Sequence, residues 1–462
     1  MKYVSTRGTA PELTFDEAML TGLARDGGLY VPAEIPQMSS DDIAALAGLS
    51  YEDTAFRVMH PFVSDSFSAE EFRGCIDRAY AGFGHAARAP LKQLNENHFL
   101  LELFHGPTLA FKDFAMQLIG QLFEAELTRR GQRVTIVGAT SGDTGSAAIE
   151  AFRGLDAVDV FILYPHGRVS EVQRRQMTTP SESNVHALAV DGDFDDCQAR
   201  VKDMFNDFAF RDGVGLAGVN SINWARVLAQ VVYYFSSAVA LGAPHRKVSF
   251  TVPTGNFGDI FAGYIAKRMG LPIDKLVVAT NQNDILHRCL TGQGYHKGDT
   301  IPSISPSMDI QVSSNFERAL FDAYGRDGNA VAQLMDELKQ GGFEVSQGAL
   351  QSLQDTYASG RVSEEETKAA IGTWLASSGE LLCPHSAIGV KVGEDLRDTA
   401  TPMITLATAH PAKFPAAVED ASGVHPPLPP RMADLYERPE RVTRIANDLT
   451  AIEDHIKDAR AK

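Results

Sequence analysis

The sequence predicts an α/β protein built on parallel sheets. Between about residue 90 and residue 410, apolar β-branched segments alternate with segments of helical periodicity, and each apolar segment is followed by a turn signal. Strands that alternate with helices form crossover units, whose parallel sheet is covered on both faces. With 462 residues, 44% hydrophobic and 22% charged, the chain is long enough for two or three domains and a large core. The expected strands are residues 133–137, 159–164, 185–190, 247–252, 275–280 and 403–408.

The segments before and after these strands divide the chain into three parts. Helical patterns predict an N-terminal cap or small domain over residues 1–90. Residues 91–415 form the main α/β region, in which we expect two subdomains. Residues 416–462 contain a proline-rich linker and then an apolar stripe, which predicts an amphipathic C-terminal helix docked on the body or on a second subunit. The N-terminal helical patterns are residues 14–23, 40–46 and 69–80, the linker is residues 425–431, and the stripe is Val442, Ile445, Leu449, Ile452 and Ile456.

Two further segments inside the main region have helical character. Residues 227–243 approach the length of a membrane span, but Gln230, Ser236 and Ser237 interrupt the apolar run. A buried helix is therefore expected, and no membrane contact. Residues 326–374 also look helical.

Charge and cysteine content restrict the partners and the compartment. The formal net charge is −17, from 42 basic and 59 acidic residues, and this field repels nucleic acid and anionic lipid. The chain begins without an apolar segment of signal-peptide length, so we expect a cytoplasmic protein. Four widely spaced cysteines favour buried thiols over a zinc site or disulfides; they are Cys75, Cys197, Cys289 and Cys383.

One lysine stands in unusual surroundings. Lys112 lies between two phenylalanines in the segment HGPTLAFKDF, residues 105–114. Pro107 suits a first helical turn and Gly131 suits a helix stop, which predicts a helix over residues 108–130. On this helix Lys112 points roughly 130° away from a polar stripe, toward the face that should be buried. The stripe consists of Asp113, Gln117, Gln121 and Glu124.

A lysine on an apolar face has three explanations. Its stem can lie along the apolar surface while the ammonium reaches water. It can belong to a buried ion pair, although Asp113 points elsewhere on the predicted helix. It can also be a functional amine, because burial and the positive end of a helix both disfavour the ammonium form. A neutral lysine amine attacks carbonyls, so Lys112 is a candidate for a Schiff base.

Two glycine-rich turns connect a strand to a helix. The first includes Gly138 and the sequence TSGDTG, and the second includes the sequence TGNFGD. Each offers free backbone N–H groups at the positive end of a helix, which is what a phosphate or carboxylate requires. Neither matches a nucleotide-binding signature. Two such turns at neighbouring strands indicate two anionic groups; the turn residues are Thr140, Ser141, Gly142, Asp143, Thr144 and Gly145, and then Thr254, Gly255, Asn256, Phe257, Gly258 and Asp259.

The segment NSINWAR, residues 220–226, combines Ser221 and Asn223 with Arg226. Arginine with hydroxyl and amide donors suits a phosphate, because the planar guanidinium satisfies two oxygens together. Taken alone, the segment is better explained as an ordinary helix start with a solvated arginine. Three histidines near turns have no companion at metal-ligand spacing, so no metal is expected; they are His105, His385 and His410.

A buried lysine together with two anion-binding turns is the set expected of a pyridoxal phosphate enzyme. The sequence resembles threonine synthase, in the longer form of bacteria and fungi. The resemblance follows family order over most of the chain and implies the fold-type II architecture, with residues 1–90 as the N-terminal threonine synthase domain. Its motifs are MKYVSTRG, GLARDGGLYVP, FHGPTLAFKDF, ATSGDTGSAA, NSINWAR, VPTGNFGDIFAGYIAKRMGLP, ATNQND, SMDIQVSSNFER and TAHPAKFP.

The resemblance implies a role for each matching residue. Lys112 would hold pyridoxal 5'-phosphate as a Schiff base and then act as general base and acid. Thr408 would face the pyridine nitrogen, and Asp143 would lie beside the 3-hydroxyl of the cofactor. The cofactor phosphate would bind to Gly255, Asn256, Phe257, Gly258 and Asp259. The substrate carboxylate would bind to Thr140, Ser141, Gly142 and Thr144, and the substrate phosphate to Ser221, Arg226, Thr144 and Asn256.

The implied reaction is the last step of threonine biosynthesis. It converts O-phospho-L-homoserine and water to L-threonine and phosphate, by γ-elimination and then β-addition of water. Such a lyase would act as a monomer or a homodimer. Two alternatives stay open: a related lyase that releases a 2-oxo acid from phosphohomoserine, serine or threonine, and a non-catalytic module that binds an anion.

Overall fold

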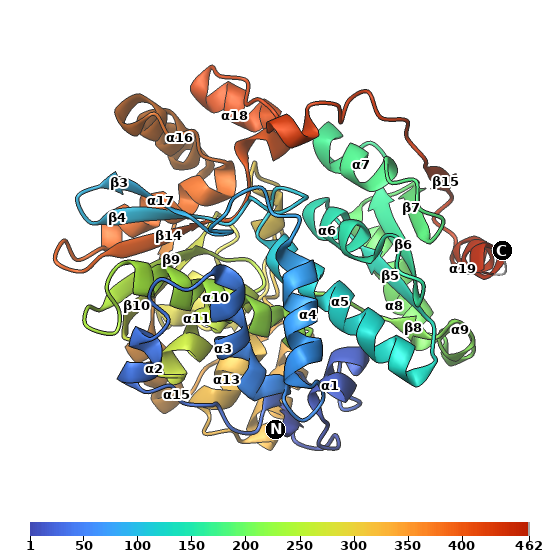
Figure 1. Ribbon diagram of the computed structural model, residues 1–462, viewed down its shortest axis with the longest axis horizontal. Coiled ribbons are helices and arrows are strands. Elements are labelled where there is room, and N and C mark those ends of the chain that lie inside the picture. The colour runs from blue at the N-terminus through green and yellow to red at the C-terminus, as the bar shows by residue number, and fades with distance from the viewer. Residues whose placement is uncertain (461–462) are drawn as a thin grey trace.

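Two parallel sheets form the body of the protein. The computed structural model describes residues 1–460, and its sheets lie on either side of the centre (Figure 1). The larger sheet has the order β13-β10-β9-β14-β4-β3 and is parallel except for the β3–β4 pair, whereas all pairs in the sheet β15-β7-β6-β5-β8 are parallel. The predicted α/β class is confirmed, and each of the six expected strands is present. The strands of the two sheets are β3 Leu91–Asn95, β4 His98–Glu102, β5 Val134–Ala139, β6 Val158–Pro165, β7 Val185–Val190, β8 Leu216–Ala217, β9 Val248–Pro253, β10 Ile273–Thr280, β13 Tyr357–Arg361, β14 Met403–Ala407 and β15 Thr443–Ile445.

Helices cover both sheets and fill the space between them (Figure 1). Two short antiparallel pairs, β1 Tyr3–Ser5 with β2 Tyr30–Pro32 and β11 Tyr295–His296 with β12 Gly342–Phe343, complete the strands. The helices are α1 Phe15–Thr21, α2 Ser40–Ala44, α3 Tyr51–Val63, α4 Ala69–Tyr80, α5 Lys112–Arg130, α6 Asp143–Phe152, α7 Glu171–Thr178, α8 Phe194–Asn206, α9 Phe208–Val214, α10 Trp224–Ala240, α11 Gly258–Arg268, α12 Ile285–Leu290, α13 Phe316–Ala323, α14 Gly328–Lys339, α15 Gln347–Thr356, α16 Glu364–Ser378, α17 Pro384–Leu396, α18 Pro415–Ser422 and α19 Leu449–Arg460, with 3-10 turns at Pro306–Met308, Pro411–Lys413 and Pro430–Met432.

The N-terminal segment packs against the middle of the molecule. Helix α4 lies on α5, and α3 lies on α10. The ring of Tyr3 contacts that of Trp224, with 6.1 Å between their centroids. The fully buried Arg318 donates a hydrogen bond of 2.9 Å to the carbonyl of Tyr30. Residues of the first 80 positions therefore share one hydrophobic core with the α/β region.

Helix α5 begins later than its sequence predicts. Its first residue is Lys112, not Thr108, because Leu109 has a left-handed φ of 66° and Ala110 forms an antiparallel bridge with Ala409. The helix ends as predicted at Gly131, whose left-handed backbone accommodates the stop.

Asp113 was predicted to lie on the polar stripe, and this was wrong. The side chain is fully buried, whereas Gln117, Gln121 and Glu124 are half-buried. Asp113 accepts hydrogen bonds from the N–H of Thr108 at 2.8 Å and from its hydroxyl at 2.6 Å. The turn before the helix folds back over the Asp113 carboxylate. The helix face on which a residue lies therefore does not by itself determine whether its side chain is exposed.

Of two other helical predictions, one is confirmed and the other is partly wrong. Residues 227–240 form a buried helix as expected, part of α10. Among residues 1–460, no helix combines the length and the apolar composition that crossing a bilayer requires. The segment 326–374 is not helical throughout, because Tyr357–Arg361 is the strand β13, which pairs in parallel with β10. Sheet pairing at this position overrides the local helical pattern.

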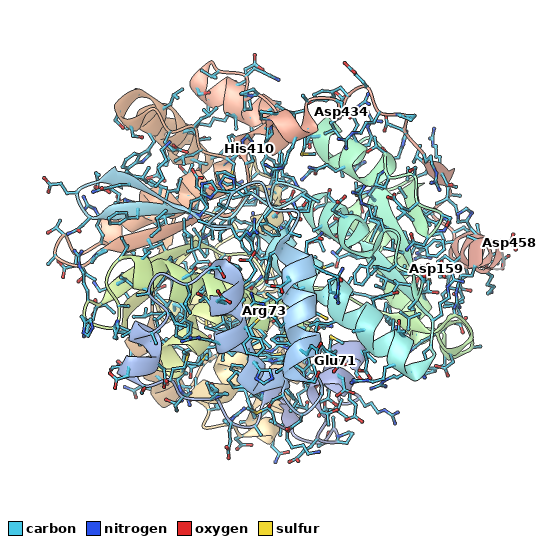
Figure 2. The ribbon with its side chains drawn as sticks, in the orientation of Figure 1. Glu71, Arg73, Asp159, His410, Asp434 and Asp458 are labelled. Atoms are coloured by element: carbon cyan, nitrogen blue, oxygen red, sulfur yellow. The ribbon has the colours of Figure 1, made fainter. Side chains whose placement is uncertain are left out.

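The C-terminal stripe divides into a strand and a helix. Ile445 belongs to β15, which pairs with β7, and Val442 is 50% exposed. Only the second half of the stripe is helical: Ile452 and Ile456 of α19 are fully buried in a small cluster with α8 and the five-stranded sheet. Figure 2 shows Asp159 of β6 near this helix, and its Oδ2 lies 3.5 Å from Arg460 Nε. The helix therefore docks on the body of its own chain.

Helices α5 and α6 approach so closely that only glycine fits at position 120. A Cβ there would lie 2.4 Å from the carbonyl oxygen of Ala151. We expect Gly120→Ala to lower the free energy of unfolding by about 1–3 kcal/mol, because overpacking outweighs the gain of about 1 kcal/mol in helix propensity. Melting temperatures measure the change. The control is Gly74→Ala in α4, where a Cβ meets only the flexible end of Arg78 at 3.2 Å and stability should hold or rise; equal effects of the two substitutions would contradict this packing.

Candidate active site

The candidate site lies where several parallel strands end. Lys112 opens α5, and Asp143 opens α6 directly after the turn that follows β5. The second glycine turn follows β9, and Thr408 follows β14, whose end is tied to the Lys112 turn by a 2.8 Å hydrogen bond from the N–H of Phe111 to the carbonyl of Thr408. Carboxyl ends of parallel strands are the usual place for a ligand site in an α/β fold. Both sheets therefore contribute to one site, and the expectation that the two glycine turns follow neighbouring strands was wrong, because β5 and β9 belong to different sheets.

Lys112 is buried and paired. Only 8% of the residue is exposed, and its Nζ lies 3.5 Å from Asp143 Oδ2 and 4.7 Å from the ring centroid of Phe111. Burial lowers the pKa of Lys112; Asp143 opposes this shift, and the charges of Lys413 and Arg226 add to it. The explanation in which the ammonium reaches water is thus excluded. The amine is available at a lower pH than an ordinary lysine, as nucleophilic chemistry requires.

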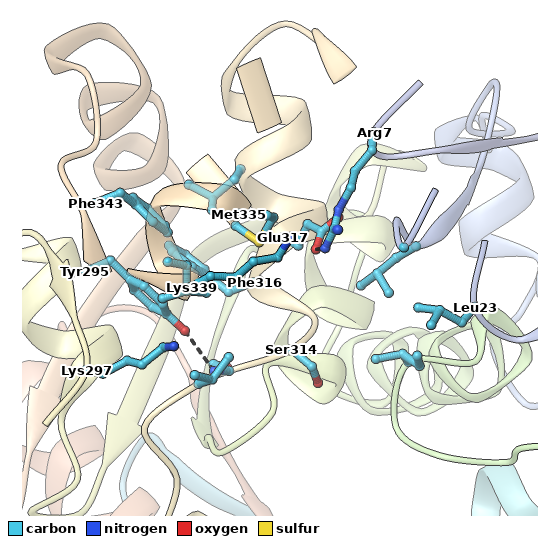
Figure 3. Close-up of a pocket in the computed structure, with 17 residues that line it drawn as sticks. Arg7, Leu23, Tyr295, Lys297, Ser314, Phe316, Glu317, Met335, Lys339 and Phe343 are labelled. Carbon is cyan, nitrogen blue, oxygen red and sulfur yellow. Dashed lines mark hydrogen bonds and ion pairs between the residues drawn. The ribbon is translucent and has the colours of Figure 1, made fainter. Parts of the chain in front are cut away.

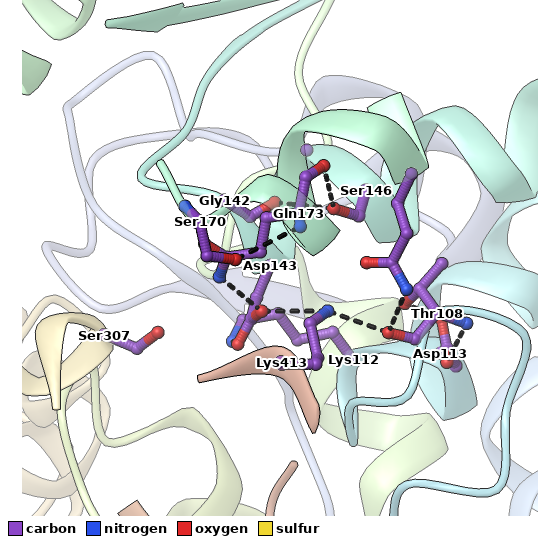
Figure 4. Close-up of polar contacts among 12 residues, drawn as sticks. Thr108, Lys112, Asp113, Gly142, Asp143, Ser146, Ser170, Gln173, Ser307 and Lys413 are labelled. Atoms are coloured by element: carbon purple, nitrogen blue, oxygen red, sulfur yellow. Dashed lines mark hydrogen bonds and ion pairs between the residues drawn. The ribbon is translucent and has the colours of Figure 1, made fainter. Parts of the chain in front are cut away.

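Asp143 is the centre of the polar network (Figure 4). Its Oδ1 lies 2.9 Å from Lys413 Nζ and accepts a 2.9 Å hydrogen bond from Gln173 Nε2. Burial raises the pKa of Asp143, but the charges of Lys413 and Lys112 outweigh burial and hold it well below its ordinary value. Asp143 is therefore an ionised acceptor inside the protein. Sequence reasoning missed Lys413, which is fully buried; its place in the TAHPAKFP motif was the available signal.

The first glycine turn is shaped by Thr140. Its Oγ1 accepts the N–H groups of Gly142 and Gly145, both at 2.9 Å. Gly142 has a φ of 138°, and a Cβ there would lie 2.3 Å from the Gln173 side chain. Among residues 1–460, no acceptor pairs with the N–H of Ser141, and Asp143 and Thr144 begin α6 with N–H groups that have no partner inside the helix. These N–H groups can receive an anion.

The second glycine turn has the same property. Within the part of the chain that the structure describes, the N–H groups of Gly255, Asn256 and Phe257 donate to no protein acceptor, and Gly258 and Asp259 open α11. A Cβ at Gly255 would lie 2.7 Å from the carbonyl oxygen of Ser307, so a side chain would disturb the turn. Phe257 has a left-handed φ of 63° and packs its ring between those of Phe316 and Tyr357, which holds the turn.

The carboxylate of Asp259 is hydrogen-bonded to α10 and does not serve as a phosphate ligand. Its Oδ1 accepts hydrogen bonds from the hydroxyls of Tyr233 and Tyr234 on α10. Burial raises the pKa of Asp259 to about 7, against the lowering effect of these hydroxyls. The contribution of Asp259 to an anion is therefore its backbone N–H at the start of α11.

The NSINWAR segment places Arg226 inside the protein. Asn223 caps α10 by accepting the N–H of Ala225, as an ordinary helix start does, but the solvated arginine of that interpretation is wrong: Arg226 is 4% exposed. Its guanidinium donates to the carbonyl of Val219 at 3.2 Å, and within residues 1–460 its Nε has no acceptor. Burial lowers the pKa of Arg226 to about 10. A buried cation with a free donor suits an incoming anion.

Ser221 and Asn256 meet at a third segment. Ser221 Oγ lies 3.4 Å from Ser314 Oγ, which donates to Asn256 Oδ1 at 3.3 Å. Ser313 Oγ donates to the carbonyl of Gly255 at 2.6 Å, so residues 313–315 support the second turn from outside. Behind them a cavity of about 340 Å³ is lined mainly by apolar side chains (Figure 3).

The three histidines lie around the site without forming a ligand set. His105 Nε2 lies 2.6 Å from Glu102 Oε2. His410, labelled in Figure 2, accepts the N–H of Ala412 through Nδ1 and caps the 3-10 turn that carries Lys413. His385 Nε2 accepts the N–H of Ser307 at 3.3 Å.

His385 should make the protein sensitive to acid. Burial lowers its pKa to about 4; Asp143 opposes this shift, and Lys112 and Lys413 add to it. Because an unfolded histidine titrates near about 6.5, the stability that neutral His385 contributes is complete above that pH and is lost as the pH falls toward about 4. We expect His385→Gln to lose less melting temperature than the parent between pH 7.5 and pH 5. The exposed His425 provides the control, His425→Gln; an acid sensitivity unchanged in His385→Gln would contradict the assignment.

Fold and site together define a class of enzyme. A buried lysine amine between two helix N-termini with free N–H groups can hold an aldehyde that carries a phosphate, as pyridoxal phosphate does. The model of the pyridoxal-phosphate dependent enzyme family matches residues 85–337. Two further models, threonine synthase N terminus and threonine synthase C-terminal, match residues 2–80 and 386–456. The chain belongs to the threonine synthase family, as its motifs predicted.

Relatives match the chain from end to end. The threonine synthase of Pseudomonas aeruginosa is 56% identical over 98% of this chain and 97% of its own. The crystal structure of pyridoxal phosphate-bound threonine synthase from Brucella melitensis superimposes with a TM-score of 0.98, at 56% identity over 99% of each chain. The yeast enzyme gives a TM-score of 0.94 at 41% identity, over 100% of this chain and 99% of its own. These matches confirm the expected pyridoxal phosphate-dependent lyase class.

Proposed function

We propose that the protein converts O-phospho-L-homoserine and water to L-threonine and phosphate. The observation that carries the proposal is the buried Lys112 amine, paired with Asp143 beside the first glycine turn, in a chain whose two glycine turns both have free N–H groups. Bound pyridoxal phosphate would supply the electron sink for negative charge that develops on the substrate carbons. The remaining steps fall to residues of this chain.

The cofactor would be held at four places. Lys112 would bind its aldehyde, and the N–H groups from Gly255 to Asp259 would bind its phosphate. Asp143 would accept from the 3-hydroxyl, because its ionised carboxylate lies within 3.5 Å of the Lys112 amine. Thr408 would face the pyridine nitrogen with a hydroxyl instead of a carboxylate, which would leave that nitrogen largely unprotonated.

The substrate would be bound through its two anionic ends. The N–H groups of the first turn, from Thr140 to Thr144, would bind the carboxylate. The phosphate would lie against Ser221, Asn256 and Arg226. Arg226 is suited to this because a buried guanidinium with an unused Nε–H gains a charge-assisted hydrogen bond when a phosphate arrives.

Lys112 would move the protons. Once released from the cofactor, its amine would remove the α proton and then a β proton of the substrate, and phosphate would leave from the γ carbon. One proton would return to the γ carbon, which becomes the methyl group, and after water has added at the β carbon the other would return to the α carbon. One base can serve both carbons because the lysine stem is long and flexible. Its lowered pKa keeps a larger share of the amine neutral, and its apolar surroundings keep other water away.

The setting of the reaction is also part of the proposal. The substrate would be a small molecule, and no nucleic acid or membrane partner is proposed. The four cysteines are buried and free, which fits a reducing compartment such as the cytoplasm. The enzyme would act as a monomer or homodimer, with residues 1–90, 91–415 and 416–462 as its three parts.

An assay of the purified protein with O-phospho-L-homoserine tests the function. Phosphate and threonine should appear in equal amounts. Equal amounts of phosphate and 2-oxobutyrate without threonine would assign the alternative lyase activity. A protein that takes up no pyridoxal phosphate and releases no phosphate would instead be the anion-binding module, and the proposal would fail.

A further inference from the structure

Lys413 is the second lysine of the site, and no step above uses it. It is fully buried on the 3-10 turn Pro411–Lys413. Its Nζ lies 2.9 Å from Asp143 Oδ1 and donates a 2.8 Å hydrogen bond to the carbonyl of Thr108. A fully buried ammonium is costly unless it is paired, so its position needs both partners.

The two lysines bind opposite oxygens of one carboxylate. Lys112 approaches Asp143 Oδ2 and Lys413 approaches Oδ1, as Figure 4 shows. Lys413 is also anchored near Lys112, because the carbonyl of Thr108 belongs to the turn that leads into α5. Gln176 Nε2 donates to the same carbonyl at 3.0 Å, which fixes this anchor further.

The need for a second cation beside Asp143 rests on the proposed function, in which Lys112 acts as a base. A base must lose its proton to act, and when Lys112 becomes neutral its ion pair with Asp143 disappears. Without another cation, Asp143 would then be a buried carboxylate without a counter-ion, which would favour return of the proton to Lys112 or protonation of Asp143. Lys413 supplies a second ion pair at the other oxygen of Asp143, 2.9 Å from its Nζ.

We propose that Lys413 is a positioning residue that holds Asp143 ionised and in place while the Lys112 amine loses and regains its charge. Lys413 acts through Asp143 and does not itself transfer a proton to substrate. Other groups that face this cluster are Arg226 from α10, Asp259 from α11, His385 and Cys383 at the start of α17, and Asp113 from α5.

Reductive methylation of the full-length protein tests this without relying on threonine formation. Cofactor is removed, formaldehyde and cyanoborohydride are added between pH 6 and pH 10, and labelling of Lys112 is followed by mass spectrometry. The midpoint of the labelling rate reports the pKa of Lys112. Lys413→Met should raise this midpoint by about one pH unit, because Asp143 then pairs with Lys112 alone. Lys413→Arg should restore it, and the exposed Lys339→Met should leave it unchanged.

A second pair of variants decides whether Lys413 acts through Asp143. In an Asp143→Asn background, the rise in the labelling midpoint caused by Lys413→Met should be less than half of that in the parent protein. Only direct repulsion between the two lysines is left in this background. An equal shift in both backgrounds would overturn the proposal, as would a folded Lys413→Met protein with an unmoved midpoint. If Lys413→Met does not fold, the same comparison uses Lys413→Gln, and a folded protein with an unmoved midpoint again counts against the proposal. Failure of the threonine assay with a shifted midpoint would reject the proposed function alone.

Discussion

Lys112→Ala should lose threonine formation by about 10²- to 10⁴-fold while it still takes up pyridoxal phosphate. The loss follows because a positioned general base contributes about that factor, and Lys112, a buried amine paired with Asp143, is the base of the proposed function. Cofactor uptake should persist because the N–H groups of the second turn and the pair of Asp143 with Lys413 are untouched. Rates of phosphate and threonine release, with the visible absorbance of bound cofactor, measure both parts.

Two further measurements make this result specific to the amine. Borohydride should fix the cofactor covalently to the parent protein at Lys112, and should fix none to the Ala variant. A small primary amine added to the variant should restore part of the rate. Turnover within tenfold of the parent would disprove the assignment of Lys112 as the base.

Arg226→Met should weaken the use of phosphohomoserine much more than it disturbs the fold. We expect kcat/KM to fall by about 30- to 1000-fold, equivalent to about 2–4 kcal/mol, because the variant removes a buried charge from the proposed site of the substrate phosphate. Inhibition by inorganic phosphate should weaken in parallel. The melting temperature of the cofactor-free protein should not fall, because Arg226 is a buried cation whose Nε has no acceptor within residues 1–460.

The control for Arg226 is an arginine at the surface. Arg444 is 64% exposed and pairs with Asp191, so Arg444→Met should leave kcat/KM within a factor of two. If Arg226→Met changes neither kcat/KM nor phosphate inhibition by more than threefold, the substrate phosphate binds elsewhere.

The features predictable from sequence are those that depend on neighbours along the chain. Buried parallel strands appear as continuous apolar runs, so all six expected strands were found. Five strands of the two sheets, β3, β4, β8, β13 and β15, were missed; β8 and β15 are short and β13 is polar, and pairing with distant strands creates these three. For Lys112, periodicity correctly indicated a buried side chain, since packing follows the helix face.

The contacts that give the site its electrostatics depend on segments far apart in sequence. Lys413 comes from near the end of the α/β region, and although it lies in the TAHPAKFP motif, no periodicity around it indicates burial against Asp143. The carboxylate of Asp113 lies on a polar face by periodicity, yet the turn at Thr108 covers it. Burial of Arg226 likewise depends on how α10 packs against α3, α5 and α11, which periodicity does not specify.

The strand β15 covers one edge of the five-stranded sheet, which matters while the protein is being synthesised. Until residues 443–445 leave the ribosome, β7 is an open edge of the five-stranded sheet, and open edges recruit strands from other chains. The hydrophobic cluster that Ile452 and Ile456 complete stays uncovered over the same period. This half of the protein is therefore closed only when residues 443–456 are in place, and changes that delay their docking would favour aggregation over folding.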